Sequence, residues 1–277
     1  MQALAITSVG IEDIAAIEIQ ELIKSKSSID KSVIQFKVKK LEEICLVAYK
    51  AQSINRIMFL LDKFEFIDNP SEILETKMLK YKLKEWLTNK KFDIQCIRQG
   101  EHEFSSADIE IKLKNKLAKD FKKNFDTELD YNNPDIIILI YIIDEKIYLG
   151  LDFSGFDLYK RQYKIFPSPD SLRGPLAYSL LRLSSFKENS TFLDPFVGDG
   201  VITIEAALFS SKFPVRHYSK DKFIFKNFNQ FKDFNFKGFY SKLDKRQKTK
   251  TKVFGYAFHF KNVDATKKNA KIAGVLD

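Results

Sequence analysis

One stretch of this sequence decides the fold: TFLDPFVGDGVITIEAA, from Thr191 to Ala207. It opens with a short apolar run that ends at Asp194, passes through a loop with two glycines, and returns to apolar residues at helical spacing. This order predicts a strand, a tight loop and the start of a helix. Gly198 and Gly200 would let the backbone approach a ligand, because no Cβ stands in the way. The free N–H groups at a helix start would favour an anionic group.

The order of strand, glycine loop and helix is the layout of a Rossmann-like cofactor site. Glycine spacing alone also fits a plain strand-to-helix turn that binds nothing. The two glycines alone do not distinguish a cofactor site from a plain turn, and both interpretations stay open. The other residues of the loop are more specific.

The residues around the glycines resemble a known family. Asp194-Pro195-Phe196-x-Gly198-x-Gly200, continued by Ile204-Glu205-Ala206-Ala207, resembles motif I of S-adenosylmethionine-dependent methyltransferases. The most similar subgroup is the RNA guanine-N2 methyltransferases that carry a THUMP domain. That family usually has Cys at the position of Val197 and Ser at the position of Asp199.

Two stretches upstream carry the same resemblance: LYKRQYK at 158–164 and PDSLRGPLA at 169–177. They resemble the family's entry into its catalytic domain. The resemblance implies a pocket for the methionine end and the adenosine side of S-adenosylmethionine. Its expected residues are Asp194, Phe196, Gly198 and Gly200.

Length and composition indicate a soluble protein of two or three small domains. The chain has 277 residues, of which 44% are hydrophobic and 30% are charged. Met1 leads into a strand-like segment without a basic leader, and the longest apolar run, 136–143, is too short to span a bilayer. Cys45 and Cys96 lack metal-binding spacing and are expected in the core. These features fit a cytoplasmic protein without a metal site.

The positive charge is concentrated in one segment. Residues 210–252 hold thirteen Lys or Arg and three Asp, so the rest of the chain is close to neutral although the net charge is +9. Basic residues interleaved with aromatic ones can bind nucleic acid, since phosphates take the charge and bases stack on rings. Alternatively, the phenylalanines are the core of an inserted helical element. We expect both in part: buried phenylalanines, a Lys/Arg face toward RNA, and a flexible loop at 245–252. The phenylalanines are Phe213, Phe223, Phe225, Phe228, Phe231, Phe234, Phe236 and Phe239.

Residues 1–68 predict a small α+β domain with no catalytic pattern. Strands are expected at 3–7, 33–38 and 57–64, and helices at 11–23 and 41–49. The order fits an α+β sandwich, and the resemblance places a ferredoxin-like domain here.

Residues 69–154 predict a second domain. Asn69, Pro70 and Glu72 indicate a helix start, and that helix is expected to run to about Asn89. The further expected elements are a strand at 92–98, a helix capped by Ser105 or Ser106, and a hairpin of 136–143 with 147–153.

The stretch RQGEHEFSSADI, residues 98–109, resembles the strand-to-helix junction of a THUMP domain. THUMP domains bind the acceptor end of tRNA, so the resemblance implies RNA-backbone contacts from Arg98, His102 and Lys112. The simpler interpretation, which we prefer for His102, makes it an ordinary exposed loop residue and Asp108 a partner of the helix dipole.

Residues 155–277 predict the first half of an α/β, Rossmann-like methyltransferase domain. A linker leads to a helix at 174–183, and motif I follows. A strand at 253–258 precedes a helix that Asn262 caps and Gly274 ends. This part resembles motif II, where an acidic residue accepts hydrogen bonds from the ribose. The chain departs from the pattern, because Ala257 stands where that acid is expected and His259 and Phe260 replace Asp-Pro.

The Asn/Asp-Pro-Pro-aromatic motif IV, which does the chemistry in the family, does not occur in these 277 residues. An exocyclic amine is a poor nucleophile, and that motif accepts its hydrogens and stacks on the flipped base. We therefore expect no catalytic residues, a weak or lost cofactor site, and no methyl transfer by the chain alone.

The sequence thus predicts the THUMP-bearing part and the first half of the methyltransferase domain of an RNA guanine-N2 methyltransferase acting on tRNA. Two alternatives stay open: a non-catalytic tRNA-binding adaptor, and one half of a split enzyme completed by a partner chain. The expected RNA-binding residues are Arg98, His102, Lys112, Lys160, Arg161, Lys245, Arg246 and Lys248.

Overall fold

The computed structural model describes residues 1–81 and 83–276, and it begins with the small α+β unit expected for the first 68 residues. One short strand was not expected from the sequence, because Ile29 is its only apolar residue. The elements are β1 (Gln2–Ile6), α1 (Glu12–Ile23), β2 (Ser27–Asp30), β3 (Val33–Lys37), α2 (Leu41–Lys50) and β4 (Arg56–Glu65).

The second region contains the expected strand, capped helix and hairpin. The single helix expected to run to Asn89 is wrong, because the chain forms one helix that ends at Lys80 and another that begins at Lys84. Ser105 is the N-cap of the long helix, and it forms a reciprocal capping box with Asp108. The elements are α3 (Ser71–Lys80), α4 (Lys84–Leu87), β5 (Lys91–Gln99), α5 (Ser106–Phe125), β6 (Glu128–Leu129), β7 (Ile136–Ile143) and β8 (Lys146–Asp152).

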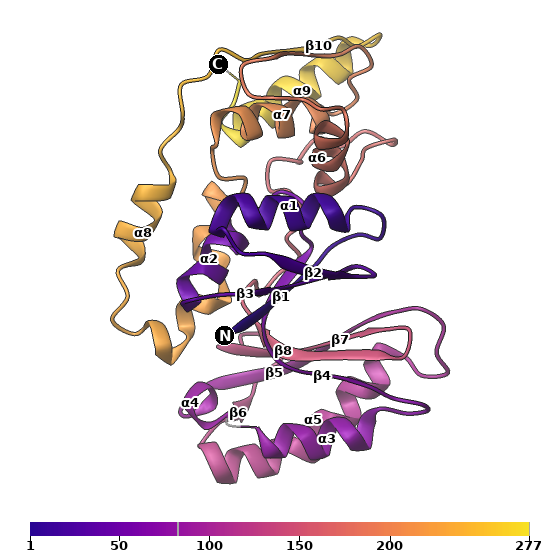
Figure 1. Ribbon diagram of the computed structural model, residues 1–277, viewed down its shortest axis with the longest axis vertical. Helices are drawn as coiled ribbons and strands as arrows, with labels where there is room; N and C mark the ends of the chain where they lie inside the picture. The colour runs from indigo at the N-terminus through magenta and orange to yellow at the C-terminus, as the bar shows by residue number, and fades with distance from the viewer. Residues whose placement is uncertain (82, 277) are drawn as a thin grey trace.

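One eight-stranded sheet runs through both regions, in the order β2-β3-β1-β4-β8-β7-β5-β6. β4 pairs antiparallel with β8, so the sheet crosses the boundary expected between residues 68 and 69. In Figure 1, α1 and α2 cover one half of the sheet, and α3 and α5 lie below the other half. The boundary itself stays a prediction, but the two regions share a continuous sheet.

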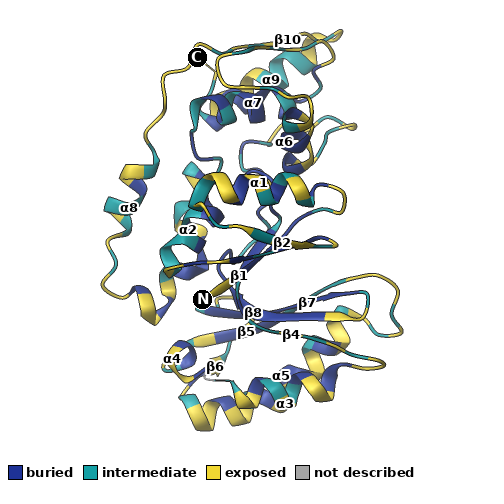
Figure 2. Ribbon diagram, in the orientation of Figure 1, coloured by how far each residue is buried: buried dark blue, intermediate teal, exposed yellow. Residues whose placement is uncertain are grey.

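The helix-free faces of the two sheet halves are buried together. Leu4 of β1, Met58 of β4 and Leu139 of β7 belong to one apolar cluster, and each is completely buried. At the edge of this cluster, the Tyr141 hydroxyl donates to Ser32 Oγ at 2.9 Å. Figure 2 shows β7 and β8 buried along most of their length. The N-terminal 154 residues therefore form one compact support.

The third region is a short parallel sheet with helices. Its two strands pair in parallel, and Asp194 at the end of the first lies opposite Gly255 at the end of the second. The second strand was expected to reach residue 258, but it ends at Gly255. Gly274 ends the last helix in a left-handed conformation with φ +73°, as expected. The expected cap at Asn262 is wrong, because His259 is the N-cap and Asn262 lies inside the helix. The elements are α6 (Gly174–Leu183), β9 (Thr191–Asp194), α7 (Val201–Ser211), β10 (Lys252–Gly255) and α9 (Phe260–Ala273).

Residues 213–243, here called the aromatic strap, leave the third region and pack on the first two. Phe228 lies between Trp86 and Phe153, with ring centroids 5.5 and 5.1 Å away. Phe223, Phe225 and Phe231 are buried in the same core, which confirms the interpretation of these phenylalanines as core residues. The strap consists of η1 (His217–Lys222), η2 (Ile224–Asn227), η3 (Asn229–Phe231) and α8 (Phe236–Leu243).

Asp244 closes the strap onto the N-terminal support. Its Oδ1 accepts from the Tyr49 hydroxyl at 2.5 Å, and Oδ2 lies 2.5 Å from Lys220 Nζ. Partial burial alone would raise the pKa of Asp244, but the hydrogen bonds from Lys220 and Tyr49 outweigh it and hold this pKa below its ordinary 3.8. The ionised carboxylate is therefore the form that holds the strap.

In the part of the chain that the structure describes, no helix is both long and apolar enough to cross a membrane. The described residues also contain no group of three His, Cys, Asp or Glu side chains placed to hold a metal ion. Cys45 and Cys96 are free and buried, as expected. Burial raises the pKa of the Cys96 thiol to about 12, so this thiol is unreactive at neutral pH.

Replacing Asp244 should destabilise the fold in a pH-dependent way. A depressed carboxyl pKa adds stability above the unfolded-state pKa, and that stability is lost as the pH falls through the folded-state value. We expect Asp244→Asn to lower the free energy of unfolding by about 1.5–3 kcal/mol at pH 7, with the difference shrinking below pH 3.8. Urea unfolding between pH 3 and 7 measures it, with the exposed Asp233→Asn as control. A difference that does not depend on pH would contradict this account.

Candidate cofactor site

The motif I loop is tied at both ends to Tyr256, the residue after strand β10. Asp194 O accepts from Tyr256 N, and Tyr256 O accepts from Val197 N, each at 2.8 Å. The Asp194 side chain turns the chain locally, since its Oδ1 accepts from Phe196 N at 3.0 Å. The loop therefore has a defined shape, held by these hydrogen bonds.

The two glycines of this loop are required by close packing. Gly200 has φ +84°, and a Cβ there would lie 2.6 Å from Thr266 Cγ2 on α9. A Cβ on Gly198 would lie 2.7 Å from Ser168 Oγ in the linker. The sequence interpretation assigned the glycines to the approach of a ligand. The structure shows that they also let the loop pack against α9 and the linker.

Asn269 on α9 holds the loop and the linker together, a role that was not expected from the sequence. It is completely buried, and its Nδ2 donates to Asp199 O at 2.9 Å and to Phe166 O at 3.0 Å. Its Oδ1 accepts from the amides of Ile165 and Phe166. An asparagine inside a helix pattern gives no sequence signal for this role, because its partners are distant backbone groups.

Asp199 is buried and held in place on the linker side. Its Oδ2 accepts from the Ser171 hydroxyl and lies 3.9 Å from Lys164 Nζ. Lys164 Nζ also donates to Leu172 O at 2.8 Å. The Asp that replaces the family's usual Ser therefore ties the loop to the linker.

A cavity of about 380 Å³ opens beside this loop. All four expected cofactor residues line it: Asp194, Phe196, Gly198 and Gly200. Val201 and Ile202 at the start of α7 line it as well, and the first N–H groups of a helix have no partner within the helix. The opposite wall includes His259, Lys261 and Asn262. A helix start that lines a cavity beside a glycine loop fits a ligand of the kind expected.

Ala257 does not line this cavity. It lines a separate one of about 310 Å³ with Val197, Thr203 and Thr266, between β10 and the helices α7 and α9. The expectation that Ala257 stands in the place of the ribose acid stays a prediction. β10 ends at Gly255, and His259 is the residue beyond its end that lines the cofactor cavity.

The expected RNA contacts fall into separate groups. Arg98 and His102 lie together, with Nη1 and Nδ1 3.1 Å apart, and His102 Nε2 lies 2.7 Å from Asp144 O. His102 is thus a half-buried, hydrogen-bonded residue, and the simpler expectation of an exposed loop residue is wrong. Lys112 is exposed on α5, and Lys160 is exposed in the linker.

The loop after α8 provides the other expected contacts. Lys245 and Lys248 are exposed, and the Arg246 guanidinium lies 4.3 Å from the centre of the Phe213 ring and donates to Gly274 O. In Figure 1, the chain from α8 to β10 lies toward the end of the molecule opposite α5. The structure therefore does not bring all the expected contacts onto one surface.

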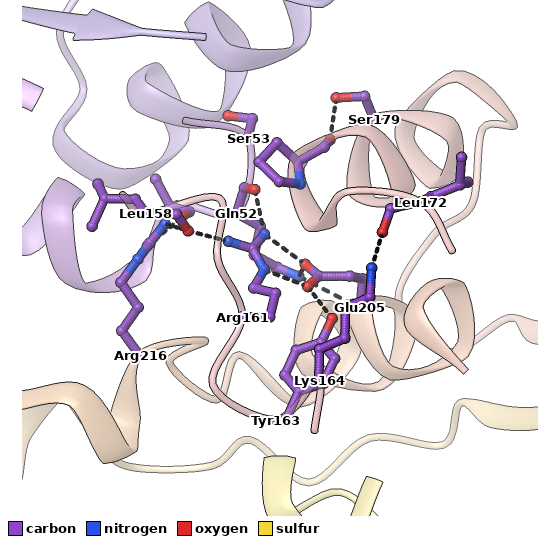
Figure 3. Close-up of polar contacts among 12 residues, drawn as sticks. Gln52, Ser53, Leu158, Arg161, Tyr163, Lys164, Leu172, Ser179, Glu205 and Arg216 are labelled. Carbon is purple, nitrogen blue, oxygen red and sulfur yellow. Dashed lines mark hydrogen bonds and ion pairs between the residues drawn. The ribbon is translucent and has the colours of Figure 1, made fainter. Parts of the chain in front are cut away.

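Arg161 is wrongly predicted as an RNA contact. Its side chain is only 1% exposed, and Nε lies 2.7 Å from Glu205 Oε1. The guanidinium also donates to Leu158 O at 2.8 Å and to Gln52 O at 2.6 Å (Figure 3). All its nitrogens are thus used inside the protein, out of reach of a phosphate.

Two family models match the chain: residues 72–152 match the THUMP domain, and residues 161–277 match the RMKL-like methyltransferase domain. The chain therefore joins a THUMP domain to an RMKL-like methyltransferase domain. The first match lies within the second region, and the second match begins in the linker.

Curated relatives are similar over most of the chain. A tRNA (guanine(6)-N2)-methyltransferase of Methanocaldococcus jannaschii is 31% identical over 241 residues, which are 83% of this chain and 61% of the relative. The protein of the same name from Archaeoglobus fulgidus is 29% identical, over 74% of this chain and 53% of the relative. The chain thus spans less than two thirds of the length of these relatives.

Solved structures share the fold. A protein of Listeria monocytogenes, described as a predicted N6-adenine-specific DNA methylase, matches with a TM-score of 0.79 and 19% identity, over 100% of this chain and 72% of that one. SMU.472, solved with SAH, matches with a TM-score of 0.80 and 19% identity, over 100% and 73%. TrmN of Thermus thermophilus matches with a TM-score of 0.65 and 19% identity, over 100% and 71%. These matches show a methyltransferase-like fold along the whole described chain.

Proposed function

We propose that this chain binds tRNA and S-adenosylmethionine as part of an enzyme that methylates N2 of a guanosine. The observation that carries the proposal is the cavity at the start of α7, lined by all four motif I residues, in a chain that also has a THUMP domain. The curated relatives act on guanine N2 of tRNA by their names, which supports the substrate class. A cytoplasmic location fits a tRNA-modifying role and belongs to the same proposal.

When bound, S-adenosylmethionine supplies a methyl group on a sulfonium that is already activated, so positioning provides most of the rate. The chain's own residues bind and orient. The α7 start offers N–H groups, the Asp194 carboxylate offers an acceptor, and Gly198 and Gly200 keep the loop close to its neighbours. Ser171 and Asn269 hold the loop in its shape before any ligand arrives.

The 277 residues contain no Asn/Asp-Pro-Pro-aromatic motif, and we assign no catalytic residue to them. We propose that transfer requires this acceptor motif in addition to the residues of this chain. A non-catalytic tRNA-binding adaptor is the alternative, and cofactor binding distinguishes the two. Neither the domain matches nor the similar structures support a separate partner chain.

Cofactor binding should be weak and centred on the motif I cavity. An imidazole at position 259 cannot replace a carboxylate as an acceptor for two ribose hydroxyls. We expect His259→Asp to strengthen binding by about tenfold to a hundredfold, since a charged hydrogen bond contributes about 1.5–3 kcal/mol. Calorimetry with S-adenosylmethionine measures this, with Ala257→Asp as the matched control because that residue lines the other cavity. Equal effects of the two substitutions would contradict the assignment of the site, and Gly198→Val should abolish binding.

The purified 277-residue chain should not transfer methyl groups to RNA. Labelled S-adenosylmethionine and bulk tRNA should give incorporation no higher than a sample without protein, because the acceptor motif is missing from these residues. Incorporation well above that background would sink the idea, and it would mean that another segment holds the target base.

RNA binding should depend on the exposed lysines of the loop after α8. Replacing Lys245, Lys248 and Lys250 with Gln should lower tRNA affinity and reduce the salt slope by about 0.9 for each phosphate that a lysine no longer neutralises. Filter binding at several salt concentrations measures the slope. Lys26→Gln, Lys39→Gln and Lys40→Gln together, at exposed positions outside this loop, remove the same net charge and are the control. An unchanged slope in the loop variant would show that these lysines are only solvated.

A further inference from the structure

The third region and the N-terminal support have separate apolar cores. One core contains sheet residues together with Phe223, Phe225, Phe228 and Phe231 of the aromatic strap. The other contains Ile204 and Leu208 of α7, Ala177 of α6 and Ala270 of α9, and the two clusters share no residue. Where the two units meet, the described contacts include a buried polar network centred on Glu205 (Figure 3).

Glu205 stands in α7, five positions after Gly200, and is completely buried. Its Oε1 accepts from Arg161 Nε at 2.7 Å and from the Tyr163 hydroxyl at 2.6 Å. Its Oε2 accepts from Gln52 Nε2 at 2.7 Å and from Arg161 Nη2 at 3.1 Å. The carboxylate thus receives donors from the linker and from the N-terminal support.

Gln52 lies in the loop between α2 and β4, and the network holds this loop from several sides. Gln52 O accepts from Arg161 Nη2 at 2.6 Å. The backbone amides of Gln52 and Ser53 donate to the Glu18 carboxylate at 2.7 and 2.9 Å. Arg216, where the chain enters the strap, donates to Ala51 O at 2.5 Å. Helix α7, which begins at the cofactor loop, is therefore tied to the loop between α2 and β4 of the N-terminal support.

The two arginines of this network, Arg161 and Arg216, are buried, and their surroundings shift their pKa values in opposite directions. Burial alone would lower the pKa of Arg161, but its ion pair with Glu205 outweighs that effect and raises this pKa. Burial also lowers the pKa of Arg216, with a further contribution from the positive charge of Arg161. Buried hydrogen bonds between charged groups demand defined distances and angles, whereas apolar packing of the strap is not directional.

We infer that the hydrogen-bonded network of Glu205, Arg161 and Gln52, here called the latch, sets the orientation of the cofactor loop relative to the N-terminal support. These three are positioning residues, because none of them lines the cofactor cavity. The functional part of the inference rests on the proposed function: a tRNA held by the THUMP domain reaches the motif I cavity at one fixed geometry. The structural part, a fixed orientation between the two units, does not depend on the reaction.

Spin labels on the two units measure this orientation directly. Lys119→Cys on α5 and Lys271→Cys on α9 place labels at exposed positions, while the native Cys45 and Cys96 are buried. In a chain with the latch intact, we expect one narrow distance distribution between the labels. The measurement needs neither RNA nor cofactor.

Two variants test the latch. Gln52→Ala removes one donor and should broaden the distribution modestly. Arg161→Met with Glu205→Leu removes the charged pair together, which keeps the chain folded where Glu205→Gln alone would leave a buried, unpaired guanidinium. The double variant should shift and broaden the distribution strongly. An unchanged, narrow distribution in a double variant that unfolds like the parent would overturn the inference.

Glu21→Gln is the matched control, because the Arg182–Glu21 pair also joins α1 to α6. Its closest N–O distance is 2.6 Å, but the Glu21 side chain is 50% exposed. A solvent-exposed pair constrains orientation little, so the distribution should stay as in the parent. A control that broadens it as much as the double variant would show that any contact between the units suffices, and this would contradict the special role of Glu205.

A crosslink provides the functional readout. A photoreactive phenylalanine analogue at position 196, which is 89% exposed at the cofactor cavity, should mark a few discrete nucleotides of bound tRNA. In the double variant we expect equal tRNA affinity but scattered or absent crosslinks. Discrete crosslinks at the same nucleotides would contradict the latch. If the parent chain binds tRNA without any crosslink, the proposed function fails, and the label distances still decide the structural inference.

Discussion

The buried carboxylate of Glu205 imposes the strictest constraint on this structure. A charge without solvent needs donors in fixed places, and here they come from Arg161, Tyr163 and Gln52. Removing one partner of such a pair usually costs about 3–5 kcal/mol, whereas replacing both with apolar groups can be neutral. The pair is therefore better explained by the orientation it enforces than by the stability it adds. Because Glu205 follows motif I closely, that orientation reaches the cofactor loop.

The aromatic strap complements this polar network. It joins the third region to the N-terminal support through apolar burial, and the Asp244 carboxylate closes it against Tyr49 and Lys220. Its phenylalanines bury apolar area while most of its lysines stay at the surface, so one segment contributes to the core and to the positive charge of the chain. The contacts between the N-terminal support and the third region thus include both apolar packing and directional hydrogen bonds.

Local patterns predicted most helices and strands, and they failed where tertiary contacts decide. The strand β2 has one apolar residue and exists because β3 pairs with it. The helix expected to reach Asn89 is broken after Lys80, although its apolar spacing continues. His259 takes the N-cap position of α9 that was expected for Asn262, and β10 ends at Gly255 and not at residue 258. Strand ends depend on pairing partners, which a single sequence does not display.

The sequence by itself determined the motif I loop, its four cavity residues and the THUMP-like junction. These depend on short-range backbone requirements and on residue types at fixed spacing. Only the tertiary structure decided which charged side chains are exposed. Arg161 and Lys160 are neighbours in a basic stretch, yet one is buried against Glu205 and the other is exposed. Asn269 holds the loop through distant backbone groups. Burial and long-range hydrogen bonds depend on which segments meet in space, and the order of residues along the chain does not record that meeting.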